Sequence, residues 1–227
     1  MEKYDLSVTI PFFNEEKTVK PLVEILVKEF SKTKINYEIL LVNNGSKDGT
    51  ENEIKKLVND RIKLVTVENN QGYGFGILNG FKASKGKYLG YIDGDLENLP
   101  SDVIKVYNKV ISNNVHIGKG LRDVRSANFI RNIASISYDL CFSLLYFKFI
   151  KQLNAKPKII SKDFYDKTNL ESKDWFIDTE ILLKALKNNH KIIVENTSYD
   201  IKPQYKSNVR VSSVWEFFMN LVRFRFK

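Results

Sequence analysis

The chain has 227 residues, and its apolar fraction of 43% is enough for one sizeable core, so we expect one domain with or without an appendage. The net charge of +9 favours an anionic partner, namely a nucleotide, nucleic acid, phospholipid or polyanionic glycan. A membrane span is excluded because no run of about 18 apolar residues occurs, and a single cysteine, Cys141, with no secretory leader in view indicates a reducing cytoplasm.

The first half of the chain alternates strand-like and helix-like segments. Apolar runs predict strands at 6–10, 37–42, 62–67 and 87–92, and apolar residues at helical spacing predict helices at 19–30, 51–58 and 74–84. This alternation is typical of an α/β fold in which helices flank a mostly parallel central sheet. Because such sheets bind ligands beyond the carboxyl ends of their strands, we expect Pro11, Asn43 and Asp93 to converge on one crevice.

The second half of the chain is less regular. Helices are expected at 100–111, 127–148 and 178–187, and strands at 115–118 and 191–195. The helix at 127–148 is apolar nearly all round, so it either packs against the sheet or touches lipid. Because neither a repeat nor a low-complexity linker occurs, we expect one domain over residues 1–200 and an appended segment over 201–227.

Two carboxylates, Asp93 and Asp95, directly follow the strand predicted at 87–92, and Glu97 comes two residues later. Side chains two residues apart at a strand end can point into one crevice. Carboxylate oxygens suit Mg²⁺ or Mn²⁺, which usually keep open positions for the phosphate oxygens of a substrate. Taken alone, this motif is better explained as a solvated acidic turn, so the rest of the chain has to decide.

Four segments stand in a fixed order along the chain: residues 11–15 (PFFNE), 43–50 (NNGSKDGT), 72–74 (GYG) and 93–100 (DGDLENLP). In this order and spacing, residues 5–200 resemble the family 2 glycosyltransferases, which have the GT-A nucleotide-diphospho-sugar transferase fold. The closer likeness is to dolichyl- and polyprenyl-phosphate sugar synthases and to bacterial glycosyltransferases that build surface polysaccharides. The resemblance implies a nucleotide-diphosphate sugar as donor and Mg²⁺ or Mn²⁺ as cofactor.

The resemblance also implies a role for each matching residue. The implied nucleotide-binding set is Pro11, Asn14, Glu15, Asn43, Asp48, Gly72 and Asp93. The implied metal-binding set is Asp93, Asp95 and Glu97, and Asp95 is also assigned to catalysis.

Three of these positions carry qualifications. Asn43 stands where the family usually has Asp, so the preferred base stays open. Asp48 is equally suited to cap the helix that follows it. Gly72 and Gly74 match the glycines of the family's third loop, with Tyr73 in place of a frequent basic residue.

Arginines after the strand predicted at 115–118 are the acceptor-side candidates. Arg122 and Arg131 lie where the resemblance places arginines for an acceptor phosphate, and guanidinium groups suit bidentate phosphate recognition. The alternative is a solvated basic face that also includes Lys119 and Arg125.

Asp178 distinguishes two mechanisms. It lies in an aromatic-rich turn that leads into a helix, residues 175–180, where hydroxyl-acceptor relatives keep a catalytic base. The alternative is a helix N-cap. A phosphate acceptor needs no base because it is already anionic at neutral pH. The stretch at 154–158 (NAKPK) departs from the Asp-rich stretch of the lipid-phosphate synthases and is similar to polysaccharide-type relatives.

The C-terminal segment 201–227 contains six basic residues and one acid. Its apolar residues form a broad stripe: Val214, Trp215, Phe217, Phe218, Leu221, Val222 and Phe224. This pattern predicts an interfacial amphipathic helix that faces a membrane. The alternative is a helix packed on the core or on a second subunit.

These observations predict an inverting, metal-dependent glycosyltransferase that lies peripherally at the cytoplasmic face of a membrane. Its acceptor is expected to be a polyprenyl phosphate or a lipid-linked glycan, and the first alternative is a soluble or surface polysaccharide hydroxyl with Asp178 as base. Partners that stay open are a second copy and a membrane protein.

Two other classes are weaker. A nucleotidyltransferase would show a Gly-rich phosphate loop after the first strand, and residues 11–15 do not provide one. A basic nucleic-acid-binding module lacks a recognised signature, so no nucleic acid is expected as partner. His116 and His190 are isolated in sequence, so no metal or triad role is assigned to them.

Overall fold

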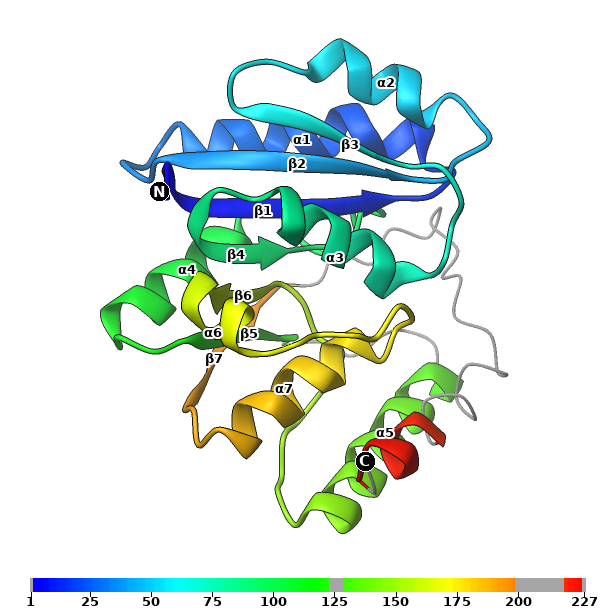
Figure 1. Cartoon of the computed structure of the whole chain (residues 1–227), viewed down its shortest axis with the longest axis vertical. Helices are drawn as coiled ribbons and strands as arrows, with labels where there is room; N and C mark the ends of the chain where they lie inside the picture. The colour runs from blue at the N-terminus through cyan, green and yellow to red at the C-terminus, as the bar shows by residue number, and fades with distance from the viewer. Residues whose placement is uncertain (1, 123–128, 199–218, 226–227) are drawn as a thin grey trace.

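The computed structural model describes residues 2–122, 129–198 and 219–225, with the side chains of residues 129–131 and 134 excepted (Figure 1). The elements follow one another in this order: β1 (Tyr4–Phe12), α1 (Glu16–Phe30), β2 (Tyr37–Asn44), α2 (Thr50–Leu57), β3 (Ile62–Val67), α3 (Tyr73–Ala83), β4 (Gly86–Tyr91), α4 (Asp102–Ser112), β5 (Ile117–Arg122), α5 (Phe129–Tyr146), β6 (Lys158–Ser161), α6 (Lys162–Lys167), α7 (Ile177–Lys187) and β7 (Ile192–Thr197). Residues 219–225 form a further helical segment beside α5.

The strands form one seven-stranded sheet in the order β3-β2-β1-β4-β6-β5-β7. All neighbouring strands run parallel except β6, which pairs antiparallel with β4 and with β5. The α/β fold with a mostly parallel sheet that the sequence predicts is therefore confirmed. Buried parallel strands are apolar on both faces, which explains why they read as continuous apolar runs.

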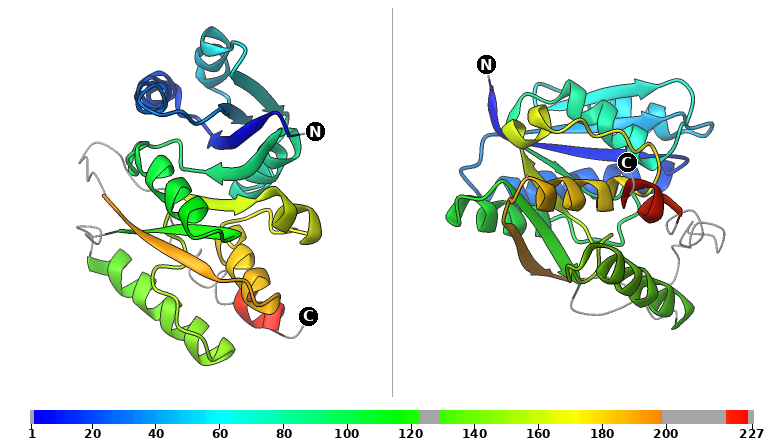
Figure 2. Two further views of the ribbon diagram at one scale, coloured as in Figure 1. Left: turned by 90° about the vertical axis from the view of Figure 1, so that its left-hand side faces the viewer. Right: turned by 60° about the horizontal axis from the view of Figure 1, so that its bottom comes forward.

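Helices cover both faces of the sheet, and each face has its own apolar cluster (Figure 2). Side chains alternate between the two clusters along a strand, so Tyr88 lies in the first cluster and Leu89 in the second. Helices α1 and α4 contribute to the first cluster, while α3, α5, α6 and α7 contribute to the second. The sheet is thus a rigid platform, and its loops carry the polar side chains of the sequence motifs.

The carboxyl ends of β1, β2 and β4 meet along one edge of the sheet. β1 pairs in parallel with both neighbours, with Phe12 opposite Asn43 and Thr9 opposite Tyr91. A Cβ atom built on Gly94 would lie 2.9 Å from the carbonyl oxygen of Pro11. Pro11, Asn43 and the turn that begins at Asp93 therefore lie along the same edge, as expected.

Three local predictions need correction. Strand β5 begins at Ile117 rather than 115 and extends to Arg122, while β6 and α6 were not predicted. Both are short, with four and six residues, and give no clear periodic signal. His116 and His190 are isolated in sequence only, because their ring centroids lie 4.6 Å apart.

The described part of the C-terminal segment, residues 219–225, packs on the core. Leu221 is fully buried, and its carbonyl oxygen accepts a hydrogen bond of 2.9 Å from the Tyr146 hydroxyl. The ring of Phe224 lies 5.7 Å from that of Phe176. These residues follow the packed alternative, whereas Val214, Trp215, Phe217 and Phe218 lie outside the described residues. Among the helices that the structure describes, none is long and apolar enough to cross a membrane.

Candidate active site

The loops after β1 and β2 are tied together by hydrogen bonds. Asn14 donates its backbone N–H to Ser46 Oγ over 3.1 Å, and its Oδ1 accepts the N–H of Lys47 over 2.8 Å. The backbone N–H of Glu15 donates to Thr50 Oγ1 over 2.8 Å. The two loops that the resemblance assigns to the nucleotide therefore form one polar unit at the edge of the sheet.

The side chains of Asn43 and Asp48 take part in this loop structure. Asn43 donates to Glu51 Oε2 over 2.7 Å and accepts from the Ser46 N–H over 3.0 Å. Asp48 accepts the N–H of Thr50 over 3.0 Å and that of Glu16 over 3.3 Å, which are the first residues of α2 and α1. The stabilising role of Asp48 at helix starts is therefore observed, and nucleotide contact by either residue stays a prediction.

Gly72 and Gly74 bring the start of α3 against the segment that precedes α7. Gly72 has a φ of 118°, and a Cβ atom there would lie 2.3 Å from the carbonyl oxygen of Lys173. A Cβ atom on Gly74 would meet the carbonyl oxygen of Ser172 at the same distance. These glycines thus have a packing reason, and they allow the ring of Tyr73 to stack on Trp175 with 4.1 Å between centroids.

The acidic motif after β4 is crowded with negative charge. Asp95 Oδ1 accepts the backbone N–H of Glu97 over 2.9 Å. Burial, followed by repulsion from Asp93 and Glu97, raises the pKa of the Asp95 carboxyl to about 7. Within residues 2–122, 129–198 and 219–225, no three His, Cys, Asp or Glu side chains are arranged as ligands of one metal ion. The predicted set of three carboxylates is thus not preassembled.

The donor chemistry nevertheless fits a divalent cation. Uncompensated carboxylate charge at Asp95 is the condition that a bound cation would relieve. Mg²⁺ commonly binds through one or two protein carboxylates together with substrate phosphates, so three preformed ligands are not required.

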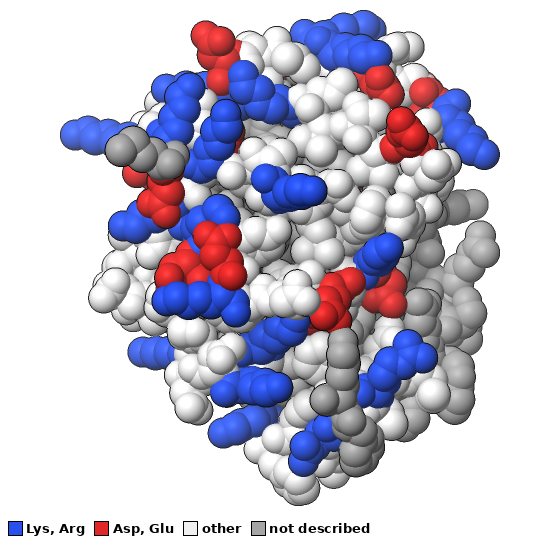
Figure 3. Space-filling view, in the orientation of Figure 1, with Lys and Arg blue, Asp and Glu red and all other residues white. Residues whose placement is uncertain are grey.

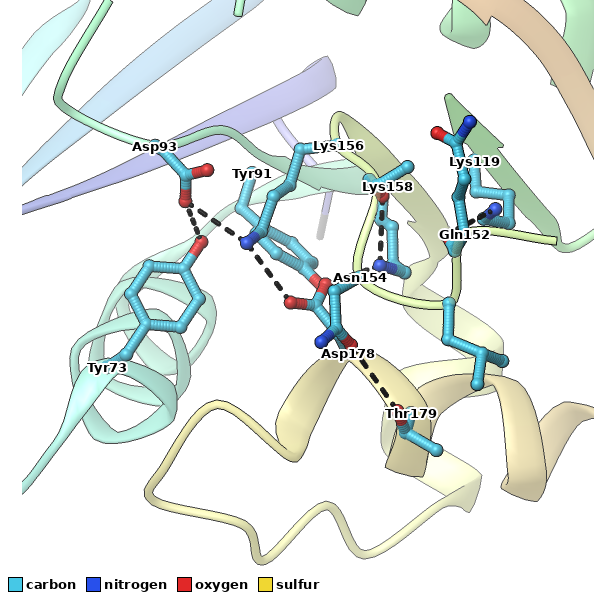
Figure 4. Close-up of polar contacts among 12 residues, drawn as sticks. Tyr73, Tyr91, Asp93, Lys119, Gln152, Asn154, Lys156, Lys158, Asp178 and Thr179 are labelled. Carbon is cyan, nitrogen blue, oxygen red and sulfur yellow. Dashed lines mark hydrogen bonds and ion pairs between the residues drawn. The ribbon is translucent and has the colours of Figure 1, made fainter. Parts of the chain in front are cut away.

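A buried ion group joins Asp93 to Asp178 through Lys156 (Figure 4). Lys156 Nζ lies 3.4 Å from Asp93 Oδ1 and 3.2 Å from Asp178 Oδ2, and its side chain is only 4% exposed. The Tyr73 hydroxyl donates to the same oxygen of Asp93. Lys158 Nζ donates to Asp178 Oδ1, which also accepts from the Tyr91 hydroxyl over 2.6 Å.

The charges of this group hold one another in the ionised state. Burial alone would raise the pKa of Asp178, but Lys156 and Lys158 keep it below the usual aspartate value. Burial also opposes the charged form of Lys156, yet Asp178 and Asp93 raise its pKa. At Lys158 the effect of burial is larger than the attraction of Asp178, so the pKa of the Lys158 ammonium falls to about 8. Asp178 lies one residue after the start of α7, and no side chain caps that helix, so the N-cap interpretation is wrong.

Lys156 and Lys158 are the site residues that sequence reasoning missed. They flank Pro157 at the entry to β6, and residues two apart on an extended chain face the same side. The available signal was the pair of lysines in the 154–158 stretch immediately before the apolar Ile159 and Ile160. Their counter-ion is remote in sequence, so the pairing itself left no local pattern.

The basic residues of β5 are partly interior. Lys119 is fully buried, and its Nζ donates to the carbonyl oxygens of Lys151 and Gln152 over 2.7 and 2.8 Å. A solvated basic face is therefore wrong for Lys119. Arg122 is half-buried at the end of β5 and is close enough to Lys156 to disfavour its charge. The side chain of Arg131 lies outside the described residues, as does Arg125.

Known proteins share this architecture. The family model described as Glycosyl transferase family 2 matches residues 7–179. A dolichyl-phosphate beta-glucosyltransferase of Dictyostelium discoideum is 29% identical over 205 residues, which are 81% of this chain and 63% of that protein. A dodecaprenyl-phosphate galacturonate synthase of Rhizobium johnstonii is 29% identical over 139 residues, which are 60% of this chain and 41% of that protein. The chain thus spans less than two thirds of the length of either relative.

A solved structure shows the same fold. The crystal structure of glucosyl-3-phosphoglycerate synthase from Mycobacterium tuberculosis in complex with Mn²⁺, UDP and glucosyl-3-phosphoglycerate has a TM-score of 0.74 against this chain. It covers 97% of this chain and 78% of the solved chain at 15% identity. At this level of identity the likeness concerns the fold.

Lys119 makes the stability of the fold depend on pH. Burial, followed by repulsion from Lys158, lowers its pKa to about 7, so between this value and the usual 10.5 the unfolded chain binds more protons than the folded chain. Stability from this group therefore rises with pH across that window, by at most about 1.4 kcal/mol per pH unit. Lys119→Met should flatten this part of the curve of unfolding free energy against pH, measured by denaturant titration between pH 7 and 9.

The surface variant Lys82→Met is the control, because Lys82 is exposed on α3. Parallel pH curves for the wild type and Lys119→Met would show that the Lys119 ammonium is not disfavoured in the folded state.

Proposed function

The chain belongs to glycosyl transferase family 2, and we propose that it transfers a sugar from a nucleoside-diphosphate sugar to a polyprenyl phosphate, with inversion at the anomeric carbon. Because it belongs to this family, the chain is a glycosyltransferase, and this conclusion stands in place of the nucleotidyltransferase and nucleic-acid-binding hypotheses. The names of the Dictyostelium and Rhizobium relatives, which specify dolichyl phosphate and dodecaprenyl phosphate, support a lipid phosphate as acceptor. Such an acceptor requires a protein at the membrane surface, and we propose the cytoplasmic face.

The state of Asp178 is the observation that carries the choice of acceptor. A hydroxyl acceptor needs a base, and an efficient base has a pKa near the working pH. Asp178 is fully buried, and Lys156 and Lys158 hold its pKa below the usual value, so it is a poor proton acceptor. A phosphate acceptor needs no proton removed, since its anionic oxygen attacks the anomeric carbon while the bond to the diphosphate breaks. We therefore assign Asp178 to positioning Lys156 and keep the base role as the alternative.

The donor is expected at the edge formed by the loops after β1, β2 and β4. Pro11, Asn14 and Glu15 would contact the nucleoside, with Asn43, Asp48 and Gly72 shaping the same loops. Asp95, with Asp93 or Glu97 beside it, would hold Mg²⁺ or Mn²⁺. When bound, such an ion stabilises the negative charge that develops on a departing diphosphate.

Residues of the buried ion group would then orient the phosphates. Tyr73 stays protonated because burial and the charge of Asp93 raise its pKa well above the usual value, so it fixes Asp93 by hydrogen bonding. Lys156 places positive charge beside this carboxylate, and Arg122 adds positive charge close to Lys156. Arg131 remains a candidate for the acceptor phosphate on the resemblance alone.

Asp95→Asn should keep the fold and abolish sugar transfer. The change removes a carboxylate that burial disfavours, so the melting temperature should be unchanged or slightly raised. Initial rates of nucleoside diphosphate release, measured over a panel of nucleotide sugars with Mn²⁺, should fall about 100-fold or more. The rise in melting temperature that UDP plus Mn²⁺ gives the wild type should also disappear.

Asp60→Asn is the matched control, because Asp60 is exposed before β3, at the end of the sheet opposite the site. Transfer by Asp95→Asn at the rate of Asp60→Asn would remove Asp95 from the mechanism.

Asp178→Asn should destabilise the protein by about 3–5 kcal/mol, because it leaves the buried Lys158 without its carboxylate partner. The double variant Asp178→Asn/Lys158→Met removes both charges and should recover much of this loss in denaturant titrations. With a polyprenyl phosphate acceptor, we expect the double variant to retain transfer within about tenfold of Lys158→Met alone. This comparison separates folding from chemistry.

A general base would behave differently in the same experiment. Its removal costs about 10²–10⁴-fold in rate even when the fold is restored. Such a loss in a stable double variant would favour the hydroxyl-acceptor mechanism.

A further inference from the structure

One face of α5 is apolar and exposed. Ile133, Ile136, Leu140 and Leu144 recur every three or four residues and are between 48% and 67% exposed. Just beyond the helix, Phe147 and Phe149 are 84% and 70% exposed. We call these six residues the α5 ridge. Helix α5 lies at the end of the molecule away from β3 (Figures 1 and 2).

The opposite face of α5 is already used by the core. Phe142 is fully buried, and Tyr138, Leu145 and Tyr146 are packed against the second apolar cluster. The helix is therefore apolar on two sides, of which only one is covered by the residues that the structure describes. Helices that are apolar all round are normally buried, and large exposed apolar patches usually mark an interaction surface.

The exposed charges that the structure describes on the loop just after α5 are positive. Segment 129–151 contains a single acid, Asp139, and it is buried. Lys148 and Lys151 are exposed among the phenylalanines of the ridge, and Arg225 donates to the carbonyl oxygen of Leu145 over 3.1 Å. Lys and Arg side chains also spread over the lower part of the face in Figure 3, where α5 and α7 lie in Figure 1.

We propose that the α5 ridge docks onto an anionic phospholipid surface. Exposed aromatic and aliphatic side chains with interleaved lysines are the composition of interfacial membrane helices. Each Lys or Arg near an anionic leaflet contributes attraction, and the long lysine stems allow the ammonium groups to stay among headgroups while the phenylalanines enter the acyl region. A second copy of this chain would present the same positive charge and would be repelled.

The inward face of α5 connects this surface to the candidate active site. The Tyr138 hydroxyl lies 2.8 Å from Thr179 Oγ1, next to Asp178. Asp139 accepts the backbone N–H groups of Gln152 and Leu153, in the loop that leads to Lys156. Docking would therefore bring a lipid-linked acceptor to the site. This consequence rests on the proposed function, whereas the docking itself does not.

Vesicle co-sedimentation tests the proposal. The wild type should bind vesicles of equal parts phosphatidylcholine and phosphatidylglycerol. Binding should be weaker at higher salt concentration, and weaker to vesicles made of phosphatidylcholine alone. Leu144→Ser/Phe147→Ser leaves the net charge unchanged and should lower partitioning onto the mixed vesicles by about tenfold or more. Both positions are strongly exposed, so unfolding free energies should stay close to wild type.

Val58→Ser/Ile111→Ser is the matched control, because it removes two exposed apolar side chains, one directly after α2 and one in α4. Lys148→Gln/Lys151→Gln should weaken binding and reduce its salt dependence. Unchanged vesicle binding by Leu144→Ser/Phe147→Ser would overturn the proposal. The proposal would also be overturned if the wild type forms a concentration-dependent dimer in sedimentation velocity and Leu144→Ser/Phe147→Ser abolishes that dimer. The α5 ridge would then bind a second copy.

A transfer assay with detergent-dispersed polyprenyl phosphate separates this proposal from the proposed function. Leu144→Ser/Phe147→Ser should transfer sugar at the wild-type rate in detergent and more slowly when the acceptor is in vesicles. If the wild type transfers no sugar in detergent or in vesicles but still binds vesicles through the α5 ridge, the proposed acceptor is refuted and the docking surface remains supported.

Discussion

Balanced charge in the interior is the constraint on which the site depends. Asp93 follows β4, Lys156 and Lys158 flank the entry to β6, and Asp178 belongs to α7, so elements from distant parts of the chain meet at one ion group. A single buried charge is very costly, and each of these side chains is tolerated because the others are present. The same ion pairs fix Lys156 beside Asp93, at the edge of the sheet where the loops after β1, β2 and β4 lie.

This arrangement links stability and specificity. A carboxylate that is paired with two buried ammonium groups binds a proton less readily, so the use of Asp178 as a counter-ion weakens it as a base. In the motif after β4, by contrast, neighbouring carboxylates repel one another. Burial and the acidic neighbours of Asp95 raise the pKa of its carboxyl. The site therefore has one region with matched charges and one with excess negative charge. Only the second has a physical need for an added cation.

Local sequence predicted the parts of the fold that depend on local patterns. The strands of the first half are apolar runs because both faces are covered, and parallel pairing brings Pro11, Asn43 and Asp93 to one edge. Strand β6 was missed because it has four residues and begins with a lysine whose carboxylate partner lies in α7. The helix predicted at 178–187 is confirmed and begins at Ile177, but the direction of the Asp178 side chain depends on two lysines that lie elsewhere in the sequence.

For helix α5 as well, the spacing of apolar residues does not show which face packs on the core. The sequence indicates that the helix is apolar nearly all round and leaves core packing and lipid contact as alternatives. In the structure one face packs on the core and another is exposed, because Phe142 is enclosed while Leu144, two residues later, is open to solvent. A lipid-linked phosphate has an apolar chain and a charged head, and it needs an apolar surface and a polar site within a short distance. Helix α5 would connect the two for the proposed acceptor, because the Tyr138 hydroxyl on its inner face contacts Thr179, next to Asp178, while the α5 ridge is exposed.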